Sequence, residues 1–433
     1  MGRIRAFSTR VLKSGSVREY AWLASLVWLP YVMYGSLLAI AYLMVTAMMQ
    51  RGRQVWQKCF QMGFGWLSIG LLLSASFGIN RGEAFLQLTN FLPFFVLWGV
   101  LVTYPAMVTR PFAVLEQLAR WLVLGAVPMC AIALAEYALK VESLIPQVKA
   151  SGLPIWLIEW LYEEPYFGHR ARSLFDHPNV LSAYLVIVLG LGLGLVLKAI
   201  DRLATKPDLV TDSVVQSQQL WRLVTLGSSV LLCLGSIFCT GSRNGLLIAV
   251  VLMAIALYTA RKYRWVWISS LVGAGVLAAA VSSFGIGGRS LSWDIFTNDP
   301  RVGVWRLAIE MIYQRPLLGW GFSGLRESYI PDSIPDYDVI YHAHNIWLFL
   351  ASESGLPVMI GFCVVCGAIC YRALRAYLAK NTALSESDRA TLFSYLLAFS
   401  ACLLFGLFDV VLYDARLNIA AWGLLAALYA MSR

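Results

Sequence analysis

The sequence has 433 residues, of which 59% are hydrophobic and only 13% are charged. Soluble globular proteins carry about a quarter charged residues and roughly half apolar ones, so a soluble enzyme is excluded. The formal net charge of +10 is modest for this length and is spread along the chain, so no nucleic-acid partner is expected. The composition is typical of an all-α polytopic membrane protein.

Apolar runs of about 20 residues, the length that crosses a bilayer, predict membrane spans along most of the chain. They lie near residues 59–79, 86–106, 121–139, 180–198, 220–239, 244–261, 265–284, 346–370, 390–408 and 415–431. Residues 20–50 form a longer apolar segment with Pro30 near its start and basic clusters on both sides. Because Lys and Arg collect in cytoplasmic loops, this segment is expected to cross twice as a hairpin. We therefore predict a single transmembrane domain, residues 1–433, with about 12 transmembrane helices and both termini in the cytoplasm.

Two loops on the outer side are predicted to be long, at residues 140–179 and 285–345. Long connections between spans often carry function. In the second loop, residues 301–315 place apolar side chains at helical spacing. This pattern predicts an amphipathic helix on the membrane surface or over a cavity.

The outer side shows a chemical bias that topology does not require. Of the 12 basic residues assigned there, ten are Arg, whose planar fork pairs with phosphate oxygens. All four histidines of the chain also fall there: His169, His177, His342 and His344. Phosphate-binding groups beside side chains that titrate near neutrality favour chemistry on a phosphorylated substrate over simple contact with lipid headgroups.

Residues 240–245, with the sequence TGSRNG, join two predicted spans in a tight outer turn. Glycines allow a ligand to approach closely, and successive N–H groups around Arg243 suit an anion. An arginine at membrane level is costly unless it is paired or functional. A functional role is therefore favoured over a plain turn.

Residues 341–345, with the sequence YHAHN, immediately precede a predicted span that Gly355 and Pro357 interrupt. A histidine at this interface could take a proton from a hydroxyl nucleophile. Asn345 fits either a helix N-cap or an orienting amide. His342 and His344 could also bind a metal, but with no third ligand nearby in sequence a general base is favoured. We expect no metal and no cofactor.

Two further groups of residues are interpreted as structural. Residues 319–324 fit the pattern G-x-G-x-x-G, but no βαβ unit surrounds them, which favours a flexible turn. Asp409, Asp414 and Arg416 lie between the last two spans. They are expected to pair among themselves or with outer arginines.

Three blocks, all on the outer side, resemble motifs of the O-antigen ligases and the related lipid-linked polysaccharide polymerases. Residues 172–179 resemble the R-x-x-G-x-F-x-x-P-N block of that family, without its glycine. Residues 240–245 resemble its T-x-S-R-x-G turn, and residues 301–321 resemble its R-x-x-x-W…P-L-L-G-x-G stretch.

A fourth block resembles the ligase signature H-N-x9-G. His344 and Asn345 are followed by nine residues and then by Gly355, although Val358 departs from the usual continuation of the signature. The resemblance covers about residues 170–360. The N-terminal third is similar only in its pattern of spans.

The resemblance implies a GT-C-like glycosyltransferase in the inner membrane of a Gram-negative bacterium, surrounded by membrane lipids, with its active site facing the periplasm. The donor would be a polysaccharide on undecaprenyl pyrophosphate, and the acceptor a hydroxyl of the lipid A–core oligosaccharide. Displacement at the anomeric carbon would invert it and expel pyrophosphate, and arginines rather than a metal could stabilise the developing charge.

The resemblance also implies roles for individual residues. His344 would deprotonate the acceptor hydroxyl, with His342 as the rival base. Arg243 and Arg301 would bind the pyrophosphate. The substrate-binding set is completed by Arg172, Arg289 and Asn345.

Three alternatives stay open. A polymerase would join repeat units, and a protein O-oligosaccharyltransferase would load Ser or Thr; both share the donor and the chemistry, and the H-N-x9-G spacing favours the ligase. A twelve-span secondary transporter belongs to a different class. Transporters often show two matching halves and charges near the midplane, and neither is visible in the sequence.

Overall fold

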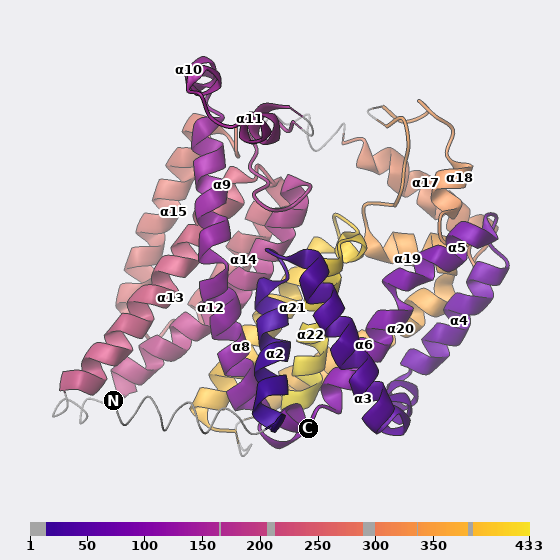
Figure 1. The fold of residues 1–433 in the computed structure, drawn as a ribbon, viewed down its shortest axis with the longest axis horizontal. Coiled ribbons are helices and arrows are strands. Elements are labelled where there is room, and N and C mark those ends of the chain that lie inside the picture. Colours follow the sequence, from indigo (N-terminus) through magenta and orange to yellow (C-terminus); the bar gives the residue numbers. More distant parts are fainter. Residues whose placement is uncertain (1–13, 164–165, 206–212, 289–298, 336, 380–383) are drawn as a thin grey trace.

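A computed structural model describes residues 14–163, 166–205, 213–288, 299–335, 337–379 and 384–433. The secondary-structure elements within these ranges are all helices (Figure 1). We call one end of the molecule the loop side, because it carries α10 (Ile145–Ala150), α11 (Ile155–Tyr162), α17 (Arg301–Gln314) and α18 (Gly324–Ser328). The opposite end, where the chain finishes, is the C-terminal side.

The first part of the chain begins with two packed helices where the hairpin is predicted, and of these two only α3 is long and apolar enough to cross a membrane. Helices α2 (Ser14–Trp28) and α3 (Met33–Met62) pack against each other, and the chain turns between them beside Pro30. The backbone of α3 leaves helical geometry at Arg51 but the helix then continues, so the basic residues after it lie in a helix and not in a loop. The next elements are α4 (Phe64–Ser76), α5 (Arg81–Gln87), η1 (Leu88–Asn90), α6 (Leu92–Val102), α7 (Pro105–Thr109), α8 (Pro111–Gly125), α9 (Val127–Leu139) and η2 (Glu142–Leu144).

The central helix of the bundle is α12 (Pro178–Thr205), which packs against α8, α13, α14 and α21. Its glycines permit this approach: a Cβ at Gly190 would lie 2.7 Å from the backbone of Ala398. Small residues let helix backbones pack closely where no hydrophobic effect drives association. The later elements are α13 (Ser213–Cys239), α14 (Arg243–Thr259), α15 (Arg264–Phe284), α19 (Ile346–Ser354), α20 (Leu356–Leu378), α21 (Glu386–Phe405), η4 (Val411–Tyr413) and α22 (Ala415–Met431).

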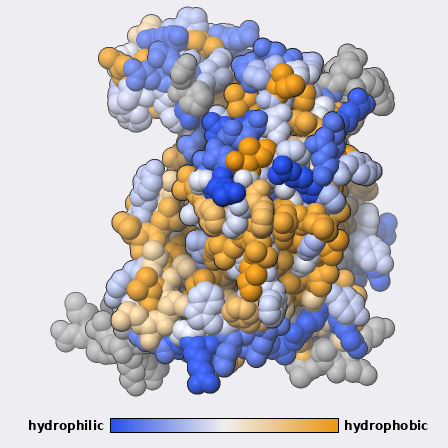
Figure 2. Space-filling view, turned by 90° about the vertical axis from the view of Figure 1, so that its right-hand side faces the viewer, coloured by the Kyte–Doolittle hydropathy of each residue, from blue (hydrophilic) through white to orange (hydrophobic). Residues whose placement is uncertain are grey.

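The exterior is that of a membrane protein. Figure 2 shows a band of hydrophobic side chains between hydrophilic ends. Within the described ranges, eight helical segments are long and apolar enough to cross a membrane, and α4, α14 and α22 are shorter apolar helices. The polytopic all-helical fold is therefore confirmed, whereas the predicted number of twelve spans is not. With 13 residues in α4 and 17 each in α14 and α22, these helices are shorter than the roughly 20 residues that span a bilayer.

The interruption predicted at Gly355 separates α19 from α20. Gly355 has a φ of 85°, a conformation that favours glycine. A Cβ there would lie 2.2 Å from the carbonyl oxygen of Leu317, and the N–H of Leu356 donates to the carbonyl of Pro316 at 2.8 Å. This break leaves α19 on the loop side, packed against α17.

A buried carboxylate organises the G-x-G-x-x-G segment. Glu353 is fully buried, and its two oxygens accept hydrogen bonds from the N–H groups of Gly324 at 2.9 Å and Leu325 at 2.7 Å. Its carbonyl accepts from the N–H of Gly321 at 2.9 Å and from Ser74 Oγ at 3.0 Å. The predicted flexible turn is therefore a packed turn around a carboxylate.

Replacing Glu353 by Gln is expected to lower the Tm of the purified protein. The amide of Gln presents an NH₂ donor to a backbone N–H, and an unsatisfied buried donor costs about 1–3 kcal/mol. Thermal unfolding in detergent measures the change. Glu327→Gln is the matched control, because the Glu327 carboxylate is exposed and, among the described residues, accepts a hydrogen bond from Asn80 Nδ2 alone. Equal Tm losses in the two variants would contradict the anchoring role of Glu353.

Candidate active site

The candidate site centres on two histidines and one aspartate on the loop side. His342 and His344 precede α19, and Asp409 follows α21. His344 Nδ1 lies 3.4 Å from Asp409 Oδ1, and His342 Nε2 lies 3.9 Å from the same oxygen. The two rings meet edge to face, with centroids 4.4 Å apart. The sequence predicts that Asp409 pairs with Asp414, Arg416 or another outer arginine, but among the described residues its ion-pair partners are the two histidines.

The pair formed by Asp414 and Arg416 is confirmed. The Arg416 guanidinium lies 2.6 Å from the Asp414 carboxylate and 3.3 Å from that of Asp176. It also lies over the ring of Phe175, 4.0 Å from the centroid. This contact joins the segment before α12 to the start of α22.

The cap of α19 fixes the position of His344. The Asn345 side chain accepts hydrogen bonds from the N–H groups of Trp347 at 2.9 Å and Leu348 at 3.0 Å, and its amide donates to the carbonyl of Leu407 at 3.1 Å. His344 itself has a φ of 47°, which is uncommon for a residue other than glycine and tends to occur at functional sites. Asn345 is thus the N-cap of α19, and it ties the histidines to the segment that carries Asp409.

Burial controls the charges in the cluster. It lowers the pKa of His342 to about 4, so this ring is neutral at pH 7. It also lowers the pKa of His177 to about 4, with a further contribution from the positive charge of Arg170. Burial alone would raise the pKa of Asp409, but the His344 ring and the nearby His342 outweigh it and hold that pKa well below its ordinary value. The site therefore contains an ionised carboxylate beside a neutral imidazole.

His344 has the geometry of a general base. Its Nδ1 lies 3.4 Å from the Asp409 carboxylate, at ion-pair distance but outside hydrogen-bond geometry, and among the described residues Nε2 has no hydrogen-bond partner. A carboxylate at one ring nitrogen orients the imidazole and leaves the other nitrogen free to accept a proton. His342 differs, because its Nδ1 accepts the backbone N–H of His344 at 3.3 Å. A pKa of about 4 also makes His342 a weak base at neutral pH.

Arg301, the first residue of α17, belongs to the same cluster. Its guanidinium acts electrostatically on His342, on His177 and on Tyr337. Burial raises the pKa of Tyr337, and the charge of Arg301 opposes this rise. The Asp299 carboxylate accepts the N–H of Arg301 at 2.9 Å and holds the start of α17. The positive end of a 14-residue helix and a guanidinium therefore meet beside the histidines.

The TGSRNG turn lies against Arg170. The Nε of Arg170 donates to the carbonyl of Thr240 at 2.8 Å, and its terminal nitrogen donates to the Asn179 side chain at 2.6 Å. Gly241 has a φ of 61°, and a Cβ there would lie 2.9 Å from the Arg170 side chain. Glycine is thus required for this contact. Arg243 begins α14 in the same turn, where the Ser242 hydroxyl caps the helix by accepting from Gly245.

One of the predicted substrate-binding arginines, Arg172, makes its contacts away from the histidines. Arg172 is buried. Its guanidinium lies over the ring of Trp160 and donates a hydrogen bond to the Trp160 carbonyl at 3.3 Å. Its N–H donates to Glu136 at 3.0 Å, and Glu136 pairs with the buried Lys140 at 2.7 Å. These contacts are typical of a structural role for Arg172. Its role in binding pyrophosphate stays a prediction. Arg289 lies outside the described residues.

Sequence reasoning assigned no individual role in the site to four members of the cluster: Asp409, Arg170, His177 and Tyr337. The sequence signal that could have pointed to these residues is their position, because each lies in an outer segment next to a predicted span. An aspartate or tyrosine in such a loop is common, so position alone does not single it out. The tertiary structure does: Asp409 and Tyr337 contact His344, and His177 feels the charges of Arg170 and Asp409.

The cluster also offers a set of metal-ligand atoms. His342, His344 and Asp409 each present one such atom, and the three atoms lie within 4.8 Å of one another. The structure thus supplies the third ligand that was missing nearby in sequence. Two imidazoles and a carboxylate can bind divalent transition metals, so a metal is the rival of the general base.

An apolar cavity adjoins the cluster. It lies among α20, α21 and α22, and Asp409 is the charged residue in its lining. The rest of the lining is uncharged and includes Trp347, Phe362, Phe399, Leu403 and Leu425. Such an apolar lining suits part of a hydrocarbon chain.

Replacing Asp409 by Asn is expected to lower the activity of the site by about 10- to 100-fold, because contacting polar residues couple by about 1–3 kcal/mol. The amide no longer fixes the orientation and tautomer of His344. Initial rates would show a loss in kcat larger than the change in KM. Asp414→Asn, on the same loop but paired with Arg416, is the control. A KM effect alone would argue against a role through His344.

Comparison with known proteins finds a family likeness over part of the chain. Residues 228–363 match the family model described as O-antigen ligase. The matched range contains Arg243, Arg301, His342 and His344. No curated protein matches the chain. The match supports assignment to the O-antigen ligase family, which implies a glycosyltransferase of polysaccharide synthesis that acts in a membrane.

Proposed function

We propose that this membrane enzyme of the O-antigen ligase family transfers a polysaccharide from undecaprenyl pyrophosphate to a hydroxyl of the lipid A–core oligosaccharide. The observation that carries the proposal is the meeting of an oriented histidine, an ionised aspartate and Arg301 beside an apolar cavity. The loop side then faces the periplasm and the C-terminal side the cytoplasm of a bacterial inner membrane. The predicted loops 140–179 and 285–345 are then both periplasmic.

His344 activates the acceptor in this proposal. Its Nε2 takes the proton of the acceptor hydroxyl while the oxygen attacks the anomeric carbon of the donor sugar. The Asp409 carboxylate, 3.4 Å from Nδ1, stabilises the imidazolium that forms. Attack opposite the leaving group inverts the anomeric carbon, and the bond from that carbon to the pyrophosphate oxygen breaks.

Arginines stabilise the pyrophosphate as it leaves. Arg301 contributes its guanidinium together with the N-terminus of α17, an end of a helix that favours anions. Arg243, and Arg170 beside the same turn, would supply further charge on this side. Removal of one preorganised donor of this kind costs about 10²–10³ in rate.

The apolar cavity would hold part of the polyprenyl chain of the donor. Its lining from α20, α21 and α22 is apolar, and its charged end lies at Asp409. A hydrocarbon chain placed there would bring the attached pyrophosphate to the level of the histidines. The lipid therefore helps to align the anomeric carbon with His344.

The test is transfer in vitro with purified protein, undecaprenyl-pyrophosphate-linked polysaccharide and lipid A–core, with and without EDTA. Lipid A–core loaded with polymer in the presence of EDTA would support a metal-independent ligase. Activity that EDTA removes and a divalent metal restores would assign His342, His344 and Asp409 to a metal. Growth of donor chains without loading of lipid A–core would indicate a polymerase. Loading of an acceptor protein at Ser or Thr would indicate a protein O-oligosaccharyltransferase. If the folded protein transfers polysaccharide in none of these assays, the result would favour the alternative of a secondary transporter.

A further inference from the structure

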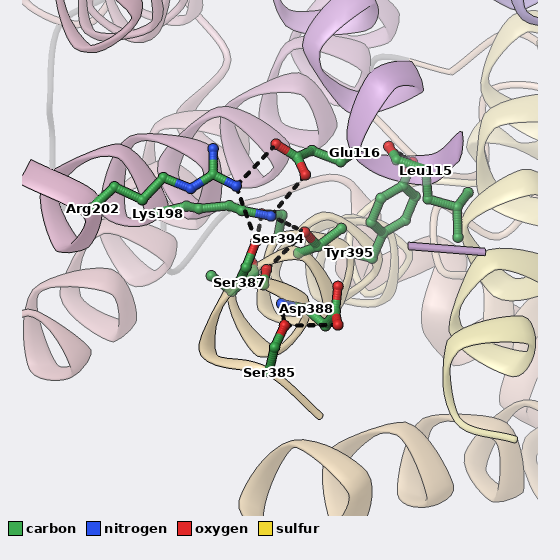
Figure 3. A network of polar contacts seen from close by, with 11 residues as sticks. Leu115, Glu116, Lys198, Arg202, Ser385, Ser387, Asp388, Ser394 and Tyr395 are labelled. Atoms are coloured by element: carbon green, nitrogen blue, oxygen red, sulfur yellow. Dashed lines mark hydrogen bonds and ion pairs between the residues drawn. The ribbon is translucent and has the colours of Figure 1, made fainter. Parts of the chain in front are cut away.

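A buried lysine on the C-terminal side gathers polar groups from three helices (Figure 3). Lys198 of α12 donates to the Glu116 carboxylate of α8 at 2.9 Å and to the Thr391 hydroxyl of α21 at 2.7 Å. Arg202, one turn further along α12, donates to the Ser387 hydroxyl at 3.0 Å and lies 3.8 Å from Glu116. The Glu116 carboxylate therefore already lies beside two cations, Lys198 and Arg202.

A cavity of about 150 Å³ opens beside this network, between α8, α12 and α13. Its charged lining consists of Glu116, Arg120, Lys198, Arg202 and Arg222. Four cations against one carboxylate leave three positive charges in excess. This excess is concentrated in one hollow, unlike the scattered basic residues that merely orient spans.

Two of the arginines have no anionic partner among the described residues. Among the described residues, no hydrogen bond or ion pair is made by Arg120 or by Arg222. Arg120 lies near Glu116, whose carboxylate oxygens already face Lys198 and Arg202. Cations held close together repel one another where the dielectric is low, so an anion between them is favourable.

The cavity is also partly apolar. Leu124, Leu195 and Leu226 line it from the same three helices, and Gln219 and Thr225 add polar groups. Leu124 is 44% exposed, so the apolar part reaches the surface of the bundle. The arginines suit a phosphate group and the leucines suit an attached hydrocarbon chain. Basic pockets between membrane helices bind lipid headgroups in this way.

We propose that this cavity is a binding site for a phosphate group, carried by an anionic phospholipid of the adjacent leaflet or free in solution. Arg120, Arg202 and Arg222 bind the phosphate oxygens, for which the guanidinium fork is suited. The bound anion joins α8, α12 and α13 at the end opposite the candidate active site. The site is independent of the proposed transfer reaction.

The experiment measures the Tm of the purified full-length protein in neutral detergent. One arm adds phosphatidylglycerol or phosphatidylcholine with the same acyl chains, and a second arm adds inorganic phosphate. Because a ligand that binds only the folded state stabilises it by mass action, phosphatidylglycerol should raise the Tm by about 3 °C or more beyond phosphatidylcholine. Native mass spectrometry should show a matching retention of phosphatidylglycerol.

The variant Arg120→Gln/Arg222→Gln should lose this shift and the retained lipid. Arg53→Gln/Arg375→Gln is the matched control, because both arginines are exposed and lie outside the cavity. A shift with phosphatidylglycerol alone identifies a lipid, and a shift with inorganic phosphate identifies a free anion; both support the site. Equal shifts with the two lipids and none with phosphate, or an undiminished shift in the cavity variant, would overturn it.

Discussion

Replacing His344 by Ala is expected to lower kcat for polysaccharide transfer by about 10²–10⁴-fold, the usual contribution of a positioned general base. Its Nδ1 faces the ionised Asp409, 3.4 Å away, and its other ring nitrogen has no partner among the described residues. Removal of the ring leaves the acceptor hydroxyl without a proton acceptor, while the sites for donor and acceptor stay in place. Initial rates with purified protein at saturating donor measure the loss.

Two histidine variants separate catalysis from packing. His342→Ala removes the acceptor of the His344 N–H and is expected to lower kcat by about tenfold, a coupling of about 1.4 kcal/mol between contacting residues. His169→Ala should stay near wild type, because His169 lies 3.8 Å from the exposed Glu142 and outside the cluster. A greater loss in His342→Ala than in His344→Ala would assign the base to His342.

Replacing Arg301 by Ala is expected to lower kcat/KM by about 10²–10³-fold, as for loss of one preorganised donor to a developing negative charge. Arg301 starts α17 beside the histidines, so its guanidinium and the helix N-terminus can act on the same pyrophosphate. The effect should fall on kcat as well as on KM, because negative charge on the leaving group grows in the transition state. Steady-state kinetics with varied donor measure both.

Arg306→Ala is the matched control for this prediction, because the exposed Arg306 lies on the same helix. It should cost less than threefold in kcat/KM, since an exposed charge away from the leaving group contributes little. Arg301→Lys should recover only part of the activity, because an ammonium keeps the charge but loses the fork. Equal losses for Arg301→Ala and Arg306→Ala would point to helix packing and not to the pyrophosphate.

The membrane class, the gathering of arginine and histidine on one side and the break at Gly355 were all determined by the sequence. Each depends on composition or on residues close together in the chain. A run of apolar residues must avoid water wherever it lies, and a glycine at φ 85° is required by its own turn. The resemblance to O-antigen ligases also depends on residues close together in the chain, because its motifs are short. The family match at residues 228–363 supports this resemblance.

Only the tertiary structure decided which distant residues meet. Asp409 contacts His344 and not Arg416, because the cap at Asn345 joins the start of α19 to the end of α21. Arg172 packs on Trp160 although its motif placed it with the substrate. Such contacts arise from the packing of helices far apart in sequence, and spacing within one segment carries no information about which other segment will lie beside it.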